Sequence, residues 1–129
     1  MEIRKFNVSE HLCIIHQWLE QHKSHKPGED EIPAHGFIAF SDNTPVAAAF
    51  LRRVECGYGQ IDGMVTNPEM SGESRHAALN AIVDQLLSMA KDFGMKGIMA
   101  ITLDKSILLR SQKYEFVQQP HTLITLKIS

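Results

Sequence analysis

The alternation of apolar and polar positions predicts a strand followed by a helix at the N-terminus. The stretch EIRKF alternates with a period of two, which predicts a short strand over residues 2–6. Leu12, Ile15 and Leu19 then share one helical face within residues 8–22, and Ser9 is the expected N-cap. Residues 23–35 are polar and contain Pro and Gly, so we expect a mobile loop that faces a substrate.

The middle of the chain has the pattern of an antiparallel hairpin followed by a further strand. Two apolar runs within residues 36–55 flank the turn residues of positions 42–45, DNTP. Residues 57–66, GYGQIDGMVT, predict the next strand.

The best-defined helix follows residues 68–76. Apolar positions recur at helical spacing from Ala77 to Phe93, and Gly94 is the expected stop. Residues 97–103 form a continuous apolar run that suits a central strand, residues 105–114 predict a short helix, and residues 121–128 predict a closing strand, with a further short strand considered at 116–118. The chain is thus expected to be a single α/β (α+β) domain over residues 1–129.

Composition and charge narrow the function classes. The 129 residues carry 13 basic and 15 acidic side chains, a net charge of −2 without long runs of either sign, which gives no indication of nucleic acid or an anionic membrane as partner. The two cysteines, Cys13 and Cys56, suggest no disulfide framework and favour a reducing compartment. The charged N-terminus lacks the apolar core of a signal peptide, so we expect a cytoplasmic protein without a membrane span.

The stretch PEMSGESRHAALNAI, residues 68–82, has two interpretations. Small and hydroxylated residues directly before a helix can offer free N–H groups to an anion such as a phosphate. The same residues can act as an ordinary helix cap with a solvated Arg75. The local sequence leaves both open.

Histidines are frequent, but their pattern does not predict a metal site. His22 and His25 have an H-x-x-H spacing beside His11 and His16, and no Cys or carboxylate completes a known zinc spacing. A nucleophile elbow, a Walker loop and a dinucleotide fingerprint are all missing from the sequence.

Two stretches of the chain carry a family pattern. Ile61, Met64, Thr66 and Pro68 fill the strand pattern I-x-x-L-x-V-x-P, and residues 104–116, DKSILLRSQKYEF, fit a closing helix. With these motifs, residues 36–118 resemble the GNAT superfamily of acyl-CoA-dependent N-acyltransferases. The resemblance implies a mixed central sheet flanked by helices, with acetyl-CoA or another acyl-CoA as cofactor and an amine as acceptor. The chain is also similar to the short GNAT-like proteins of phages and bacteria, in which polar residues often replace the loop glycines.

The family pattern implies where the cofactor binds. The pyrophosphate loop would begin at Ser71, with Ser74 and His76 at its two glycine positions, and Asp104 stands where Asn is common. Arg75 and the Ser71 and Ser74 hydroxyls could replace part of the lost glycine geometry. The implied cofactor-binding residues are Met64, Val65, Thr66, Ser71, Gly72, Glu73, Ser74, Arg75, His76, Ala77 and Asp104.

Acyl transfer to an amine also needs a base and an acid. Asp62 and Glu55 are the available carboxylates, although each is more often a solvated strand residue. Ser111 stands where the family often has its proton-donating Tyr, and Tyr114 is the substitute, unless it packs against the sheet. Because these diagnostic positions are substituted, a GNAT-shaped binding or structural module without cofactor is the alternative, and a homodimer stays open.

Overall fold

The computed structural model describes residues 1–101, 105–120, 124, 126 and 128. In this part of the chain five strands form one mixed sheet in the order β1-β2-β3-β4-β5, antiparallel except for the parallel pair β4 and β5. The strands are β1 (Glu2–Lys5), β2 (His35–Ser41), β3 (Thr44–Val54), β4 (Tyr58–Thr66) and β5 (Gly97–Ala100). The α/β prediction and its mixed sheet are confirmed.

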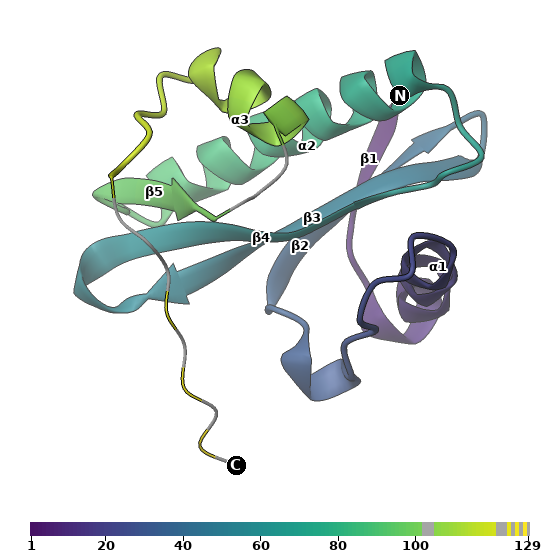
Figure 1. Ribbon diagram of the computed structural model, residues 1–129, viewed down its shortest axis with the longest axis horizontal. Helices are drawn as coiled ribbons and strands as arrows, with labels where there is room; N and C mark the ends of the chain where they lie inside the picture. The colour runs from purple at the N-terminus through teal and green to yellow at the C-terminus, as the bar shows by residue number, and fades with distance from the viewer. Residues whose placement is uncertain (102–104, 121–123, 125, 127, 129) are drawn as a thin grey trace.

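Helices cover both faces of the sheet (Figure 1). α1 (Val8–Gln21) packs on one face against a cluster centred on Ile38 and Phe50, and α2 (Gly72–Asp92) packs on the other against a cluster centred on Val46 and Leu51. α3 (Lys105–Gln112) lies beside α2. Two short 3-10 turns, η1 (Glu29–Glu31) and η2 (Glu55–Gly57), complete the assignments.

The start of α1 corrects two sequence predictions. Asn7, not Ser9, is the N-cap, because its side chain accepts hydrogen bonds from the backbone N–H groups of Ser9 and Glu10. The buried stripe is His11, Ile15 and Trp18, rotated by about one position from the predicted face. The predicted Leu12 and Leu19 are only half-buried at the border of this stripe.

Local turn chemistry explains the hairpin and the end of α2. Asp42 and Asn43 have positive φ angles of 48° and 64°, which is the backbone that a two-residue hairpin turn requires. Gly94, at φ 70°, ends α2 as predicted, and the Met95 N–H donates to the Ala90 carbonyl across it.

β4 contains a bulge that has a specific packing partner. Asp62 pairs with Phe50 and Val65 with Ala48, so β4 carries one residue more than β3 between these pairs. Gly63 within the bulge has φ 64°, and a Cβ there would lie 2.8 Å from the Phe50 ring. The bulge therefore depends on glycine and on a fully packed Phe50.

One stretch of the C-terminal part differs from its prediction. Among the described residues β5 pairs with β4 alone. The stretch 116–118 is not a strand, although Phe116 packs against the α2 cluster. The predicted closing strand 121–128 falls largely outside the described residues.

Candidate active site

β4 and β5 separate halfway along β4. Their ladder ends with the pair Ile61 and Ala100, whereas β4 continues to Thr66. The N–H of Asn67 donates to Val46 on β3, so alternation directs the backbone groups of Thr66 to the opposite side, into the gap. His22 Nε2 already donates to the Thr66 carbonyl from α1's end, at 3.0 Å.

Asn67 fixes the connection between β4 and α2. Its side chain, in a residue only 8% exposed, donates to the Pro45 carbonyl at 2.9 Å and accepts from the Glu69 N–H at 3.0 Å. All polar groups of this amide face the hairpin or the following turn. Asn67 thereby positions the N-terminus of α2 beside the gap.

A pocket of about 660 Å³ occupies this gap, and we call it the larger pocket. Three parts of the chain contribute to it: the end of α1, the end of β4, and the facing sides of α2 and α3. The lining is Leu19, His22, Ser24, Met64, Val65, Thr66, Gly72, Arg75, His76, Leu79, Ser106, Ile107 and Arg110. Six of the predicted cofactor-binding residues are therefore together, and no carboxylate is among the described residues that line the pocket.

His76 connects α2 to the Arg110 guanidinium. Arg110 Nη2 donates to His76 Nδ1 at 2.9 Å, because a guanidinium has only donors. The proton of the neutral ring then sits on Nε2, which lies 3.1 Å from the Asn80 amide nitrogen. Turning that amide by 180° makes its oxygen the acceptor, and Asn80 Oδ1 is otherwise buried without a partner.

Arg75 is the second guanidinium of the larger pocket. Among the described residues it has no ion pair and no side-chain hydrogen bond, and its Nε is buried without a partner. A buried donor without an acceptor costs free energy. An anion in the pocket would supply that acceptor.

Ser71 is an ordinary N-cap of α2. Its Oγ accepts from the Ser74 N–H at 3.1 Å, and its carbonyl accepts from the Arg75 N–H. The first turn still leaves the N–H groups of Gly72 and Glu73 without an intrahelical acceptor. Both sequence interpretations are thus compatible in one structure, since Ser71 caps the helix and two donors remain.

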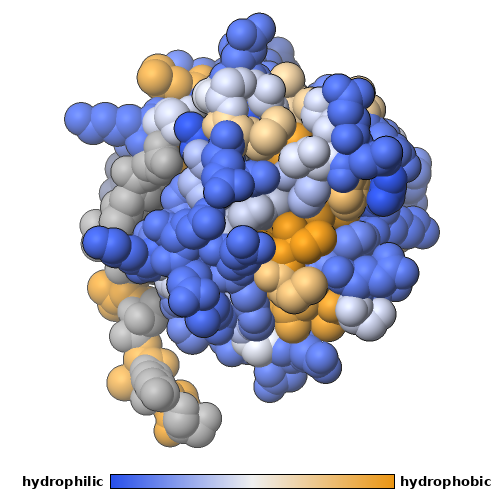
Figure 2. Space-filling view, turned by 90° about the vertical axis from the view of Figure 1, so that its right-hand side faces the viewer, coloured by the Kyte–Doolittle hydropathy of each residue, from blue (hydrophilic) through white to orange (hydrophobic). Residues whose placement is uncertain are grey.

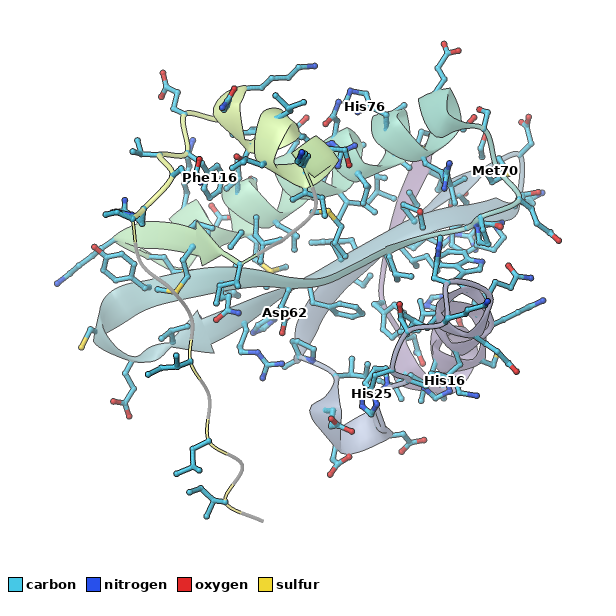
Figure 3. All side chains as sticks on the ribbon, in the orientation of Figure 1. His16, His25, Asp62, Met70, His76 and Phe116 are labelled. Carbon is cyan, nitrogen blue, oxygen red and sulfur yellow. The ribbon has the colours of Figure 1, made fainter. Side chains whose placement is uncertain are left out.

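A second pocket of about 380 Å³, the smaller pocket, shares Leu19, Met64 and Val65 with the larger one. Asp62 and His25 face the α1 side of the sheet, whereas His76 lies on the α2 side (Figure 3). The lining is Ile15, Leu19, His25, Pro27, Glu31, Ile32, Pro33, Phe50, Arg52, Asp62, Gly63, Met64 and Val65. The two pockets therefore meet at the bulge of β4.

Asp62 is paired within the smaller pocket. Arg52 Nε and Nη2 donate to its Oδ2 at 3.2 and 3.0 Å, and Oδ1 accepts from the Gly63 N–H at 2.8 Å. The Asp62 side chain keeps 39% of its surface exposed. Both an ion pair and the bulge hold this carboxylate at the junction of the pockets.

Residues of the loop 23–35, among them His25, Glu31 and Ile32, line the smaller pocket. His16 Nε2 donates to the Pro27 carbonyl at 2.6 Å and ties the loop to α1. Glu31 accepts from the Gly28 N–H at 3.0 Å, and this bond, with a smaller contribution from His25, lowers the pKa of its carboxyl. Glu31 is thus a stable negative charge at the exposed rim.

The remaining catalytic candidates line neither pocket. Glu55 lies exposed in η2 at the far end of β4. Ser111 Oγ donates to the Leu108 carbonyl at 2.6 Å, and the Tyr114 hydroxyl donates to the Asn80 carbonyl at 3.2 Å. Burial, with Asp84 nearby, raises the pKa of Tyr114, which makes it a weaker acid. Asp104 lies outside the described residues.

The surface offers little else that resembles a site. The described residues contain no group of three or more His, Cys, Asp or Glu side chains placed to hold a metal ion, and both cysteines are exposed thiols. No helix within the described ranges is long and apolar enough to cross a membrane. The face in Figure 2 is mainly hydrophilic, with a small apolar area at its centre.

Comparison with solved structures shows similarity over nearly the whole chain. A putative acetyltransferase from Agrobacterium tumefaciens has a TM-score of 0.73 at 16% identity, covering 98% of this chain and 100% of its own. A predicted acetyltransferase from Clostridium acetobutylicum, solved with acetyl-CoA, has a TM-score of 0.71 at 17% identity. The alignment covers 97% of this chain and 95% of that protein. A Mycobacterium tuberculosis protein solved with CoA has a TM-score of 0.69 at 20% identity. The alignment covers 97% of this chain and 76% of that protein.

No protein-family model and no curated protein matches the sequence. The structural likeness at these identities establishes the fold, and it confirms the fold that the resemblance over residues 36–118 implied.

Two features of the larger pocket were missed by the sequence analysis. Arg110 is separated from His76 by 34 positions, and only the packing of α3 against α2 brings them together. His22 entered the sequence analysis only as a metal candidate, yet it bonds the end of β4. No local pattern could have revealed either contact.

Proposed function

We propose that this chain, which has the fold of the GNAT acetyltransferases, transfers an acyl group from acetyl-CoA or a related acyl-CoA to an amine. The observation that carries the proposal is the pair of pockets that meet at the β4 bulge. The larger has a cationic lining suited to a polyanionic cofactor, and the smaller has carboxylates suited to an ammonium group. Solved structures with similar folds contain CoA and acetyl-CoA.

The residues of the larger pocket fit the parts of a CoA molecule. Arg75 and Arg110 would bind the phosphates through charge-assisted hydrogen bonds, together with the free N–H groups of Gly72 and Glu73. Met64 to Thr66 present strand backbone toward the gap, where the pantetheine amides could pair like an added strand. Ser71, Ser74 and Ala77 would support the helix start and need not contact the cofactor.

The smaller pocket would receive the amine with Asp62 as its carboxylate partner. Bound acyl-CoA would supply the thioester carbonyl carbon, at which the C–N bond forms while the C–S bond breaks. Asp62 would hold the incoming ammonium and accept one proton from it, which leaves the nitrogen lone pair free. That proton passes to water, and the second proton lost by nitrogen is transferred to the leaving sulfur.

The alternative is a module that binds without catalysis. Three observations favour it: Asp62 is engaged by Arg52, and the hydroxyls of Ser111 and Tyr114 are bonded away from the pockets. Such a module would have lost the cofactor site and would show no turnover.

Calorimetric titration with acetyl-CoA tests the proposal. We expect saturable binding and a stability increase of about 2.7 kcal/mol at a ligand concentration 100 times the dissociation constant. Release of free CoA thiol in the presence of amines would then identify an enzyme, and binding without this release would identify a non-catalytic module. An absence of binding at millimolar acetyl-CoA would contradict the proposal.

A further inference from the structure

The smaller pocket has an apolar floor and a charged rim. Ile15 and Phe50 at its base are 1% and 2% exposed, and Leu19, Ile32 and Pro33 continue the apolar wall. Phe50 is fixed between Gly36 and Gly63 and by an edge-on contact with Phe6 at a centroid distance of 4.8 Å. This floor is too well packed to open for a large polar ligand.

The charges around the floor favour one class of ligand. Glu31 and Asp62 contribute two carboxylates, and Arg52 is the one guanidinium among the described lining residues. Arg52 directs Nε and Nη2 at a single Asp62 oxygen, so these two charges offset each other, and Glu31 remains with His25 Nε2 at 3.8 Å from its Oε2. The lining therefore carries an excess negative charge, which attracts an ammonium group and repels a ligand carboxylate.

The position of Asp62 orients such a ligand. The Gly63 N–H fixes its Oδ1 at the bulge, next to Met64 and Val65, which both pockets share. An ammonium bound there would lie beside the residues that both pockets share, and Phe50 and Ile32 would line the space for the rest of the ligand. A volume of about 380 Å³ accommodates a small molecule.

We propose that the smaller pocket selects a small primary monoamine with an uncharged apolar body, and that it discriminates against amino acids with a free carboxylate. This inference rests on the proposed function for the acyl transfer, but binding of the amine can be measured without it. Glu31 acts as a specificity-determining residue at the rim, because it lines the pocket with a side chain that is 56% exposed.

Phenethylamine, phenylalanine, 1,5-diaminopentane and a neutral tetrapeptide with a free N-terminus form the test panel. With acetyl-CoA and the full chain, we expect kcat/KM for phenethylamine to exceed that for phenylalanine at least about tenfold, because the two differ only in the carboxylate. Comparable values for phenylalanine, or a preference for the diamine or the tetrapeptide, would overturn the proposal.

Glu31→Gln sharpens the test, since the amide oxygen can still accept from the Gly28 N–H. It should weaken phenethylamine binding by about two- to fivefold, as expected for an exposed charge, and reduce the discrimination against phenylalanine. Asp30→Asn removes a neighbouring carboxylate that does not line the pocket and should change neither value.

Amide chemical shifts recorded with phenethylamine alone separate this inference from the proposed function. Shifts at Phe50, Asp62 and Gly63 without acetyl-CoA binding would support the amine site and contradict the acyltransferase. Acetyl-CoA binding without any shift from phenethylamine at these residues would leave the acyltransferase standing and overturn the amine site.

Discussion

The larger pocket takes its charged side chains from α2 and α3, whereas the smaller pocket takes them from β3, β4 and the loop after α1. Arg75 and Arg110 give the first a positive lining, and Asp62 and Glu31 outweigh Arg52 in the second. The two differ in sign although they share Leu19, Met64 and Val65. The sheet thus separates a positively lined pocket from a negatively lined one at one bulge of β4.

This difference explains how unlike ligands could meet at one point. A polyanionic cofactor is repelled from the smaller pocket and an ammonium from the larger, so each would approach from its own face. Only Leu19, Met64 and Val65 are common to both pockets. The following predictions break or sharpen this contrast, from the largest effect to the smallest.

Removing the carboxylate at the junction should have the largest effect. Asp62→Asn is expected to lower kcat by about 10² or more, as for a lost general base, with little change in acetyl-CoA affinity. Steady-state kinetics with a primary amine measures this. Glu55→Gln is the matched control, since Glu55 lines neither pocket and should retain wild-type turnover.

Full activity of both the Asp62 and the Glu55 variant would mean that the amine loses its proton to water. An active Asp62→Asn together with an inactive Glu55→Gln would reverse the assignment of the base.

Replacing the glycine of the bulge should lower the stability of the fold and distort both pockets. Gly63→Val forces a β-branched residue to φ 64° and drives its Cβ into the Phe50 ring, at a cost of about 2–4 kcal/mol. Urea denaturation measures the loss. Gly72→Ala is the control, because no atom lies within 4 Å of its Cβ position. A Gly63 variant as stable as the Gly72 variant would contradict the packing described for the bulge.

Removing one cation should affect only the larger pocket. Arg75→Ala is expected to weaken acetyl-CoA binding by about 1.5–3 kcal/mol, with a smaller loss at high salt. Phenethylamine binding should be unchanged. Arg53→Ala provides a matched control, because Arg53 stacks on the Phe93 ring, 4.1 Å from its centroid, and lines neither pocket. Equal affinities of the two variants for acetyl-CoA would remove Arg75 from the cofactor site.

Mild acid should weaken the α1 side through His11. This residue is 6% exposed, and its Nδ1 accepts from the Asn7 N–H at 2.9 Å. Burial lowers its pKa, so below the ordinary imidazole value of about 6.5 the unfolded chain binds more protons than the folded chain. Stability is then complete above that pH and falls as the pH decreases toward the folded pKa.

Urea denaturation at pH 7.5 and pH 5.5 measures this dependence. His11→Leu should be less stable at pH 7.5, because the Asn7 N–H loses its acceptor, and should show a smaller difference between the two pH values. An unchanged difference would assign the acid sensitivity to other groups.

Most of the fold could be predicted from local sequence patterns, such as apolar periodicity, helix stops and turn residues. The apolar period from Ala77 onward and the stop at Gly94 defined α2, and the Asp42–Asn43 turn defined the hairpin. Asn7 was missed as the N-cap because Ser9 has an equivalent preference.

The candidate site could be predicted only where it follows the backbone of β4 and the start of α2. Met64 to Thr66 and Gly72 to His76 are contiguous, so a pattern could identify them. Tertiary packing brings three further residues to the pockets, namely Arg110, His22 and Arg52, and no local sequence motif identified them. Glu55 and Asp62 were indistinguishable as strand carboxylates until the bulge placed only Asp62 in a pocket.

The most direct test of the central claim is a titration of the isotope-labelled chain with acetyl-CoA and phenethylamine, alone and together, followed by amide chemical shifts. The account predicts that acetyl-CoA shifts Gly72, Arg75 and Arg110, that phenethylamine shifts Phe50 and Asp62, and that both sets appear together when both ligands are present. Displacement of phenethylamine by acetyl-CoA, or shifts by both ligands in the same set of residues, would contradict two separate pockets of opposite charge.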